Sequence, residues 1–273
     1  MSRTTQAAAQ AKNSTTTQVL GRAGMVCYGV IHVLIGYLAL RVAFGDSGEQ
    51  ADQRGALAEV GSGGFGKVVL WVLAVGLFAY AAWQVLMAAK SFHWVTKQRK
   101  RAVKRVAAVA RAVIGVALGV TAVQLASGSG SGGSGDQQQK SWTAELLSLP
   151  AGRVLVGLVA LVIIGVAVAL VSKGVRKSFL NDLNTGELPT GSRRWVTRLG
   201  TAGYLAKGLV LGIVGVLIGI AALHRDAGQA GGLDAALRTV AGQPFGTAAL
   251  VAVALGLAAY GVFCFAAAKA HKT

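Results

Sequence analysis

The sequence predicts an all-α polytopic membrane protein, in which six transmembrane helices form three parallel helical-hairpin repeats with approximate threefold symmetry. Three observations lead to this prediction. The 273 residues are 53% hydrophobic and only 14% charged, whereas ordinary soluble domains are about 25% charged. Six apolar runs each reach the roughly 20 residues that a helix needs to cross ~30 Å of hydrocarbon. Several motifs then recur at constant offsets along the chain.

The six apolar runs lack Asp and Glu throughout, and helices are expected because a helix satisfies its own backbone hydrogen bonds in lipid. The stretch before the first run is rich in Ser, Thr, Gln and Ala. A polar segment of this kind cannot bury enough apolar surface to fold, so residues 1–18 are predicted to be a disordered tail. The predicted spans are residues 22–44, 67–89, 106–126, 153–172, 202–223 and 247–268.

Charge is distributed unevenly between the loops. Lys and Arg gather in the N-terminal tail, the second and fourth loops and the C-terminal end, whereas most of the acidic residues lie in the first, third and fifth loops. The positive-inside rule therefore predicts a multi-pass protein of the bacterial plasma membrane with both termini in the cytoplasm. The net charge of +17 is interpreted as this topology signal, which also attracts anionic lipids at the cytoplasmic face. Nucleic acid is not an expected partner.

The first and last thirds of the chain repeat one another. The segment "LGRAGMVCYGVIHVLIG" from Leu20 aligns with "LGTAGYLAKGLVLGIVG" from Leu199. The segment "GFGKVVLWVLAVGLFAY" from Gly64 aligns in the same way with "PFGTAALVAVALGLAAY" from Pro244. Each copy is therefore a helix, an outer loop and a second helix.

A weaker middle copy begins at Val103 and continues with "PAGRVL" at Pro150. Each hairpin crosses the membrane twice and returns the chain to the same side. The copies are therefore parallel repeats related by rotation about the membrane normal. Their predicted bounds are residues 19–95, 103–180 and 198–273.

The outer loops also share a feature, a short amphipathic stretch before the second helix of each repeat. These stretches are "RGALAEV" at Arg54, "WTAELLSL" at Trp142 and "LDAALRTV" at Leu233. We expect them to form short helices along the outer interface. The low-complexity "SGSGSGGSG" at Ser127 is predicted to be a flexible loop.

Lys207 places a charge inside an apolar run, at a cost of roughly 2.5–3.5 kcal/mol at the centre of a bilayer-spanning helix. The repeat alignment puts Lys207 at the position of Arg111 in the second copy and Tyr28 in the first. All three are long side chains with a polar tip. One interpretation is that they anchor the helices by reaching back to the membrane interface. A second is that Tyr28, Arg111 and Lys207 line an inward-facing binding site for an anionic headgroup or solute. A third is buried helix capping or another structural use.

Glycines mark the expected helix contacts, because the absence of a side chain lets two backbones approach closely. Gly36, Gly119 and Gly215 are equivalent in the three copies. The fifth span carries a stripe of four glycines, which is predicted to be a packing face: Gly208, Gly212, Gly215 and Gly219.

The motifs "LGRAG" with Gly29, "RVAAVARA" around Arg111 and "LGTAGYLAKG" with Lys207 resemble a family of actinobacterial and cyanobacterial membrane proteins known as DUF1206, a domain of unknown function. Members carry three two-helix repeats that open with G-x-A-G-x-x-x-[basic]-G. The resemblance extends over nearly all of residues 20–269. The first copy departs from it, with Tyr28 where a basic residue is common. The resemblance implies the architecture and no activity.

Two functions stay open at the level of sequence. A non-catalytic scaffold, assembly partner or lipid-organising protein is favoured by smooth Gly and Ala faces, and its partner would be another membrane protein. The alternative is a small transporter or channel for an anionic solute or lipid headgroup, acting through Arg111 and Lys207. An enzyme is not expected, because no nucleophile with a base is evident. No cofactor is expected, and no metal, because paired His or carboxylate ligands at helical spacing are missing.

Overall fold

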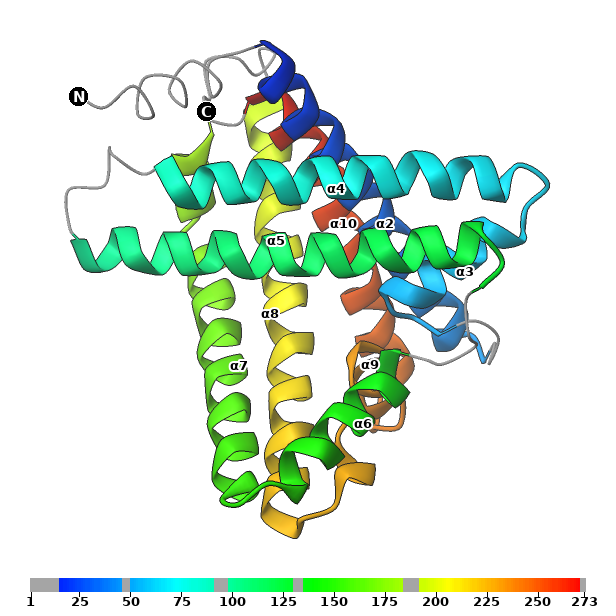
Figure 1. Ribbon diagram of the computed structural model, residues 1–273, viewed down its shortest axis with the longest axis vertical. Coiled ribbons are helices and arrows are strands. Elements are labelled where there is room, and N and C mark those ends of the chain that lie inside the picture. The colour runs from blue at the N-terminus through cyan, green and yellow to red at the C-terminus, as the bar shows by residue number, and fades with distance from the viewer. Residues whose placement is uncertain (1–14, 46–49, 91–97, 130–134, 184–191, 271–273) are drawn as a thin grey trace.

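The computed structural model describes residues 15–45, 50–90, 98–129, 135–183 and 192–270, and these residues are almost entirely helical (Figure 1). The long helices are α2 (Thr15–Ala43), α4 (Gly66–Lys90), α5 (Gln98–Ala126), α7 (Gly152–Val175), α8 (Ser192–His224) and α10 (Gly246–Ala270). The short ones are α3 (Gln53–Ser62), α6 (Gly135–Ser148) and α9 (Leu233–Ala241), with the 3-10 turns η1 (Ser178–Asp182) and η3 (Ala227–Gln229). Within the described residues, six helices are long and apolar enough to cross a membrane, which confirms the predicted spans.

The differences from the prediction lie at the ends of the helices. The first helix, α2, begins at Thr15 and so takes in the end of the tail predicted to be disordered, while residues 1–14 lie outside the described part of the chain. The three short helices confirm the predicted amphipathic stretches, but α6 begins at Gly135 rather than at Trp142. The predicted flexible loop at 127–135 is described only in part, because residues 130–134 lie outside the described ranges.

Each short helix is followed by a tight turn into the next span. The first residue of that span is glycine in all three repeats, namely Gly66, Gly152 and Gly246. A Cβ atom at any of these positions would collide with carbonyl oxygens at the end of the preceding short helix. The repeated glycine therefore explains how the chain reverses so sharply from the short helix into the span.

The spans pack mainly across the repeats. Helix α2 lies along α10, α4 along α5 and α7 along α8, so that each pair joins two neighbouring hairpins. Within a repeat, α2 packs on α4 and α8 on α10, whereas α5 and α7 of the middle repeat do not pack along one another. Figure 1 shows the consequence: α4 and α5 run across the view, and α7 and α8 run down it. The threefold arrangement is therefore open between α5 and α7.

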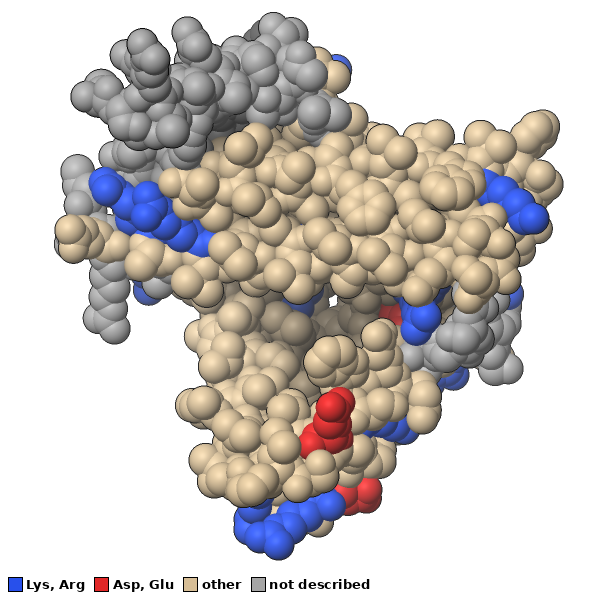
Figure 2. Space-filling view, in the orientation of Figure 1, with Lys and Arg blue, Asp and Glu red and all other residues tan. Residues whose placement is uncertain are grey.

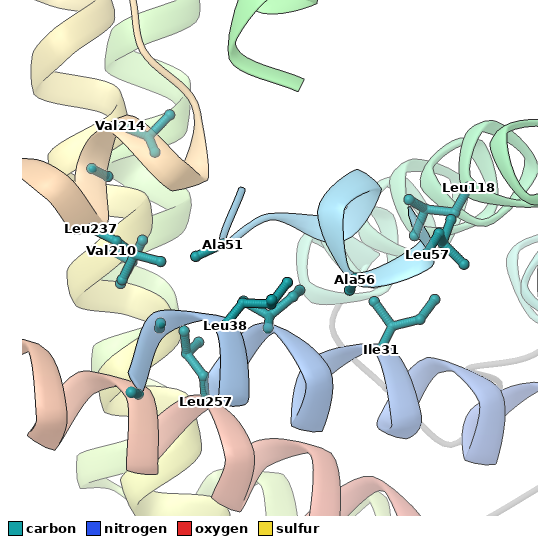
Figure 3. Close-up of a cluster of buried hydrophobic side chains, with 14 of the residues drawn as sticks. Ile31, Leu38, Ala51, Ala56, Leu57, Leu118, Val210, Val214, Leu237 and Leu257 are labelled. Carbon is teal, nitrogen blue, oxygen red and sulfur yellow. The ribbon is translucent and has the colours of Figure 1, made fainter. Parts of the chain in front are cut away.

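The bundle has two sides, the terminal side and the loop-helix side. The terminal side is where α2, α5 and α8 begin and where α4, α7 and α10 end. The loop-helix side carries α3, α6 and α9. On the loop-helix side, α3 wedges between the spans: Ala56 and Leu57 are fully buried, and Figure 3 shows Leu57 beside Leu118 of α5, with Ile31 of α2 nearby.

The outer surface of the spans is apolar. Val72 of α4, Val113 of α5 and Leu161 of α7 are each more than 60% exposed. Figure 2 shows the surface over α4 and α5 as an uninterrupted field of uncharged residues, with Lys and Arg toward its two ends. A soluble protein rarely exposes so large an apolar surface, and the arrangement is that of helices which face lipid.

The equivalent glycines lie at the close contacts between repeats. Gly36 of α2 lies against Ala254 and Ala258 of α10, Gly119 of α5 against Phe78 of α4, and Gly215 of α8 against Ile164 of α7. The other three glycines of the predicted stripe also face α7: Gly208 lies against Ala167 and Val171, Gly212 against Ala167, and Gly219 against Ala160.

Replacing Gly36 by Ala is expected to destabilise the protein. The added Cβ would lie 2.8 Å from the carbonyl oxygen of Ala254 and 2.9 Å from the backbone nitrogen of Ala258, so that α2 and α10 must separate. Overpacking of this kind costs about 1–3 kcal/mol. Gly165→Ala on α7 is the matched control, because its Cβ would meet no atom within 4 Å. Melting temperatures of the detergent-solubilised variants test the prediction, which an equal effect of both substitutions would contradict.

Candidate functional site

The three predicted binding residues lie on three different helices, and two of them are in direct contact. Tyr28 is on α2, Arg111 on α5 and Lys207 on α8. The Nζ atom of Lys207 donates a hydrogen bond to the hydroxyl oxygen of Tyr28 over 2.8 Å. The ammonium therefore points into the helix bundle, and the interpretation of Lys207 as an anchor that reaches back to the membrane interface is wrong.

A histidine completes the environment of the Lys207 ammonium. The Nδ1 atom of His32 lies 2.9 Å from the carbonyl oxygen of Tyr28. Since a carbonyl oxygen only accepts, Nδ1 must carry the proton, and Nε2 of a neutral ring is then an acceptor. Nε2 lies 3.1 Å from Nζ of Lys207, so His32 accepts the second hydrogen bond of this ammonium. His32 is nearly fully buried and acts here as a neutral ligand.

Aromatic rings surround the same ammonium. Nζ of Lys207 lies 4.4 Å from the ring centroid of Tyr260 and 5.0 Å from that of Tyr28, within the range of cation–π attraction. The ring of Tyr28 stacks on that of Tyr80 with centroids 5.2 Å apart, and Tyr204 meets Tyr260 edge to face at 5.4 Å. Four tyrosines from α2, α4, α8 and α10 thus converge at the centre of the bundle.

A cavity of about 210 Å³ lies between these rings and the terminal side, and all six spans contribute to its wall. We call it the terminal-side cavity. Its inner end is formed by Tyr28, Tyr80, Tyr204 and Tyr260. Arg111 lines the same cavity, so Arg111 and Tyr28 share one space, while Lys207 is connected to it through its bond to Tyr28.

An ion-paired group forms one wall of the terminal-side cavity. Asp182 accepts hydrogen bonds from Nζ of Lys173 at 2.9 Å and from Nζ of Lys104 at 3.0 Å. Burial by itself would raise the pKa of Asp182, but the charges and hydrogen bonds of Lys173 and Lys104 outweigh it and hold the pKa below its ordinary value. Asp182 is therefore ionised at neutral pH.

Arg111 is less well satisfied than the two lysines. Its Nε atom is buried and has no hydrogen-bond partner among the described residues. A buried polar group without a partner is unusual in a native structure and costs about 1–3 kcal/mol, more when the group is charged. The terminal-side cavity thus carries the charges of Lys104, Lys173 and Arg111 against one carboxylate in the described part of the chain.

Sequence reasoning missed several members of this site. Lys104 and Lys173 belong to the basic second and fourth loops and so contribute to the topology signal, and Asp182 has no counterpart in the other repeats. A usable signal existed for Tyr80 and Tyr260, because both end the aligned segments from Gly64 and Pro244. Two aromatic residues repeated at the same depth could have marked the centre of the bundle.

Comparison with known proteins agrees with the three-repeat architecture. The family described as Domain of Unknown Function (DUF1206) matches residues 23–91, 106–177 and 202–271. The chain is similar to the uncharacterized protein YxxB of Bacillus subtilis (strain 168), with 30% identity over 243 residues, which cover 89% of this chain and 87% of the relative. No solved structure matches. The three matches span most of the chain and coincide with the three hairpins, and the protein therefore belongs to the DUF1206 family.

Proposed function

We propose that this protein is a non-catalytic membrane protein that binds a small anionic group in the terminal-side cavity. The proposal rests on Nε of Arg111, which is buried and has no hydrogen-bond acceptor among the described residues. A phosphate, sulfonate or carboxylate oxygen in the cavity would supply that acceptor, and a charge-assisted hydrogen bond of this kind is about twice as strong as a neutral one.

The charge and size of the cavity support the same conclusion. Lys104, Lys173 and Arg111 outnumber the carboxylate of Asp182, and their field is strong because the apolar wall screens it little. The volume of about 210 Å³ is below the roughly 300–1,000 Å³ of pockets for drug-sized ligands. The expected ligand is therefore a small anion or the headgroup of an anionic lipid.

The terminal side has a second basic feature, which favours a position at the cytoplasmic leaflet. Lys177, Arg193, Arg194 and Arg198 line a groove together with Trp195, which is 64% exposed. Basic residues beside a tryptophan are typical of an interface with anionic lipid. We infer that both termini face the cytoplasm and that anionic lipids of the plasma membrane are partners. The terminal-side cavity also favours a ligand-binding function over the pure scaffold that the sequence allows.

Replacing Arg111 by Gln is expected to lower the affinity for an anion by about tenfold or more, because a hydrogen bond to a charged group contributes about 1.5–3 kcal/mol. Arg105→Gln is the control, since Arg105 lies on the same helix but is exposed. Native mass spectrometry of the solubilised protein with inorganic phosphate, methanesulfonate and phosphatidylglycerol provides the measurement.

Retention of the small anions by wild type would identify a solute site, and retention of phosphatidylglycerol alone would identify a headgroup site. Equal retention by Arg111→Gln and Arg105→Gln would contradict the proposal, as would the absence of any bound anion in the wild type.

A further inference from the structure

A second cavity lies on the other side of the Lys207 ammonium. It also has a volume of about 210 Å³, and Lys207 and His32 form its inner end. Gln53 of α3 and Gln139 of α6 line it toward the loop-helix side. We call it the loop-side cavity. Figure 2 shows the molecule hollowed below α5, beside α6, α8 and α9, where the absence of α5–α7 packing leaves the bundle open.

A thin layer of side chains separates the two cavities. Tyr28 and Tyr260 line the terminal-side cavity, whereas His32 and Lys207 line the loop-side cavity. These four residues touch one another through the hydrogen bonds of Lys207 to Tyr28 and His32 and through its cation–π contact with Tyr260. The two cavities and this layer together reach from Asp182 on the terminal side to the short helices on the other side.

We propose that the two cavities are the halves of one pathway across the membrane for a small monoanion, and that Lys207 is its gate. This inference rests on the anion site of the proposed function and adds transport of the bound anion across the membrane. The lysine is suited to the role because its four-carbon stem is flexible and its ammonium can rotate without a shift of the backbone. An anion that arrives from the Arg111 side replaces the Tyr28 hydroxyl as the partner of the ammonium and passes into the loop-side cavity.

The lining of the second half indicates which anions can pass. Between Lys207 and the two glutamines the wall is formed by apolar side chains, among them Ile35, Val210 and Val214. Strongly hydrated multivalent anions would lose their hydration there without compensation. The pathway therefore fits a monoanion with an apolar part, such as a short carboxylate or sulfonate, and the charge of Lys207 repels cations.

Proteoliposomes loaded with radiolabelled methanesulfonate test the gate, because this probe stays ionised and cannot leak as a neutral acid. A potassium gradient with valinomycin clamps the membrane potential. Wild-type protein is expected to release the probe faster than empty vesicles do. Lys207→Met, which keeps the length and removes the charge, is expected to lower the release at least tenfold. Leu209→Met is the control, because Leu209 is two residues away and 51% exposed.

The second variant is Tyr28→Phe, which removes the hydroxyl that holds the ammonium and keeps the ring. Loss of one hydrogen bond to a charged group corresponds to about tenfold or more in an equilibrium constant, so release is expected to rise by about that factor. This variant also serves if Lys207→Met does not fold. The proposed gate would be contradicted if Tyr28→Phe released the probe no faster than the wild type. It would also be contradicted if a folded Lys207→Met released the probe at the wild-type rate.

Failure of this inference differs from failure of the proposed function. A wild type that retains methanesulfonate in native mass spectrometry and yet releases none from vesicles has the binding site and no pathway. A wild type that neither binds nor releases the probe lacks both.

Discussion

Replacing Asp234 by Ala is expected to lower the free energy of unfolding by roughly 2–4 kcal/mol, because a charge-assisted hydrogen bond is lost and a buried backbone N–H is left without its acceptor. Asp234 is 4% exposed and accepts hydrogen bonds from the backbone nitrogen of Ala51 at 2.9 Å and from Nε of Arg238 at 2.6 Å. Arg238 is partly exposed and would regain water, whereas the N–H of Ala51 is buried and would be left without this acceptor. The melting temperature in mild detergent should fall by several degrees.

Asp226→Ala is the appropriate control, because Asp226 lies on the same side of the molecule and is exposed. Among the described residues, its carboxylate accepts from the nearby Gly228 and Gln229. Its melting temperature should stay close to that of the wild type. An Asp234→Ala protein that melts like Asp226→Ala would show that the bond between α9 and the first repeat contributes little.

Asp234 matters because the short helices dock on one another across the repeats. Asp234 of the third repeat holds the chain just before α3 of the first. Asp136 of the second repeat accepts from the backbone nitrogens of Gly232 and Ala235, at 2.9 and 2.8 Å, and so caps α9. Helix α9 has no capping side chain of its own. The loop-helix side is therefore joined by acidic side chains that accept hydrogen bonds from backbone N–H groups of other repeats, at the start of α9 and just before α3.

Much of this architecture follows from the sequence, because its signals are periodic and repeated. The absence of Asp and Glu from the six runs locates the spans, and the offset that relates Gly36, Gly119 and Gly215 locates the contacts between helices. The alignment of Tyr28 with Lys207 indicates that the two residues share a depth. It does not reveal that they touch, since 179 positions separate them. Only the packing of α2 and α8 on the same helix, α10, brings them together.

Other parts could not be predicted because they break the symmetry. The gap between α5 and α7 arises in the weakest copy, where the sequence still satisfies the repeat pattern. His32 aligns with Gly115 and Leu211, and a position without a repeated residue type gives no signal of its role as a ligand of Lys207. Asp182 likewise has no counterpart in the other repeats, and its role depends on Lys104, which is far from it in sequence.

Replacing Asp182 by Asn is expected to have two effects of opposite sign. Stability should fall, because the carboxylate accepts two bonds from ammonium groups and bonds of this kind contribute about 1.5–3 kcal/mol each. Affinity for methanesulfonate should rise by about tenfold, because a counter-charge of Lys104 and Lys173 is removed and a bound anion can take its place. Thermal melting and native mass spectrometry measure the two effects. Glu145→Gln, on the exposed face of α6, should change neither.

The same substitution should also change the response to acid. The pKa of Asp182 is below its ordinary value of 3.8, since Lys173 and Lys104 outweigh burial. Its contribution to stability is therefore complete above pH 3.8 and is lost as the pH falls through the lower pKa of the folded state. Asp182→Asn lacks this contribution at every pH, so its melting temperature should depend less on pH below 3.8. Parallel curves for Asp182→Asn and wild type would contradict this assignment.

The loop-helix side should respond to acid in the opposite direction. Burial raises the pKa of Asp52 and of Asp136, and the neighbouring carboxylates raise both further. A raised pKa means that the folded state takes up protons more readily than the unfolded state, so these two groups favour folding increasingly as the pH falls through that pKa. Above pH 3.8, mild acid should therefore stabilise the loop-helix side, while ionised Asp182 still stabilises the terminal side. Below pH 3.8 the terminal side should loosen first, and hydrogen exchange at η1 should increase before exchange at α9.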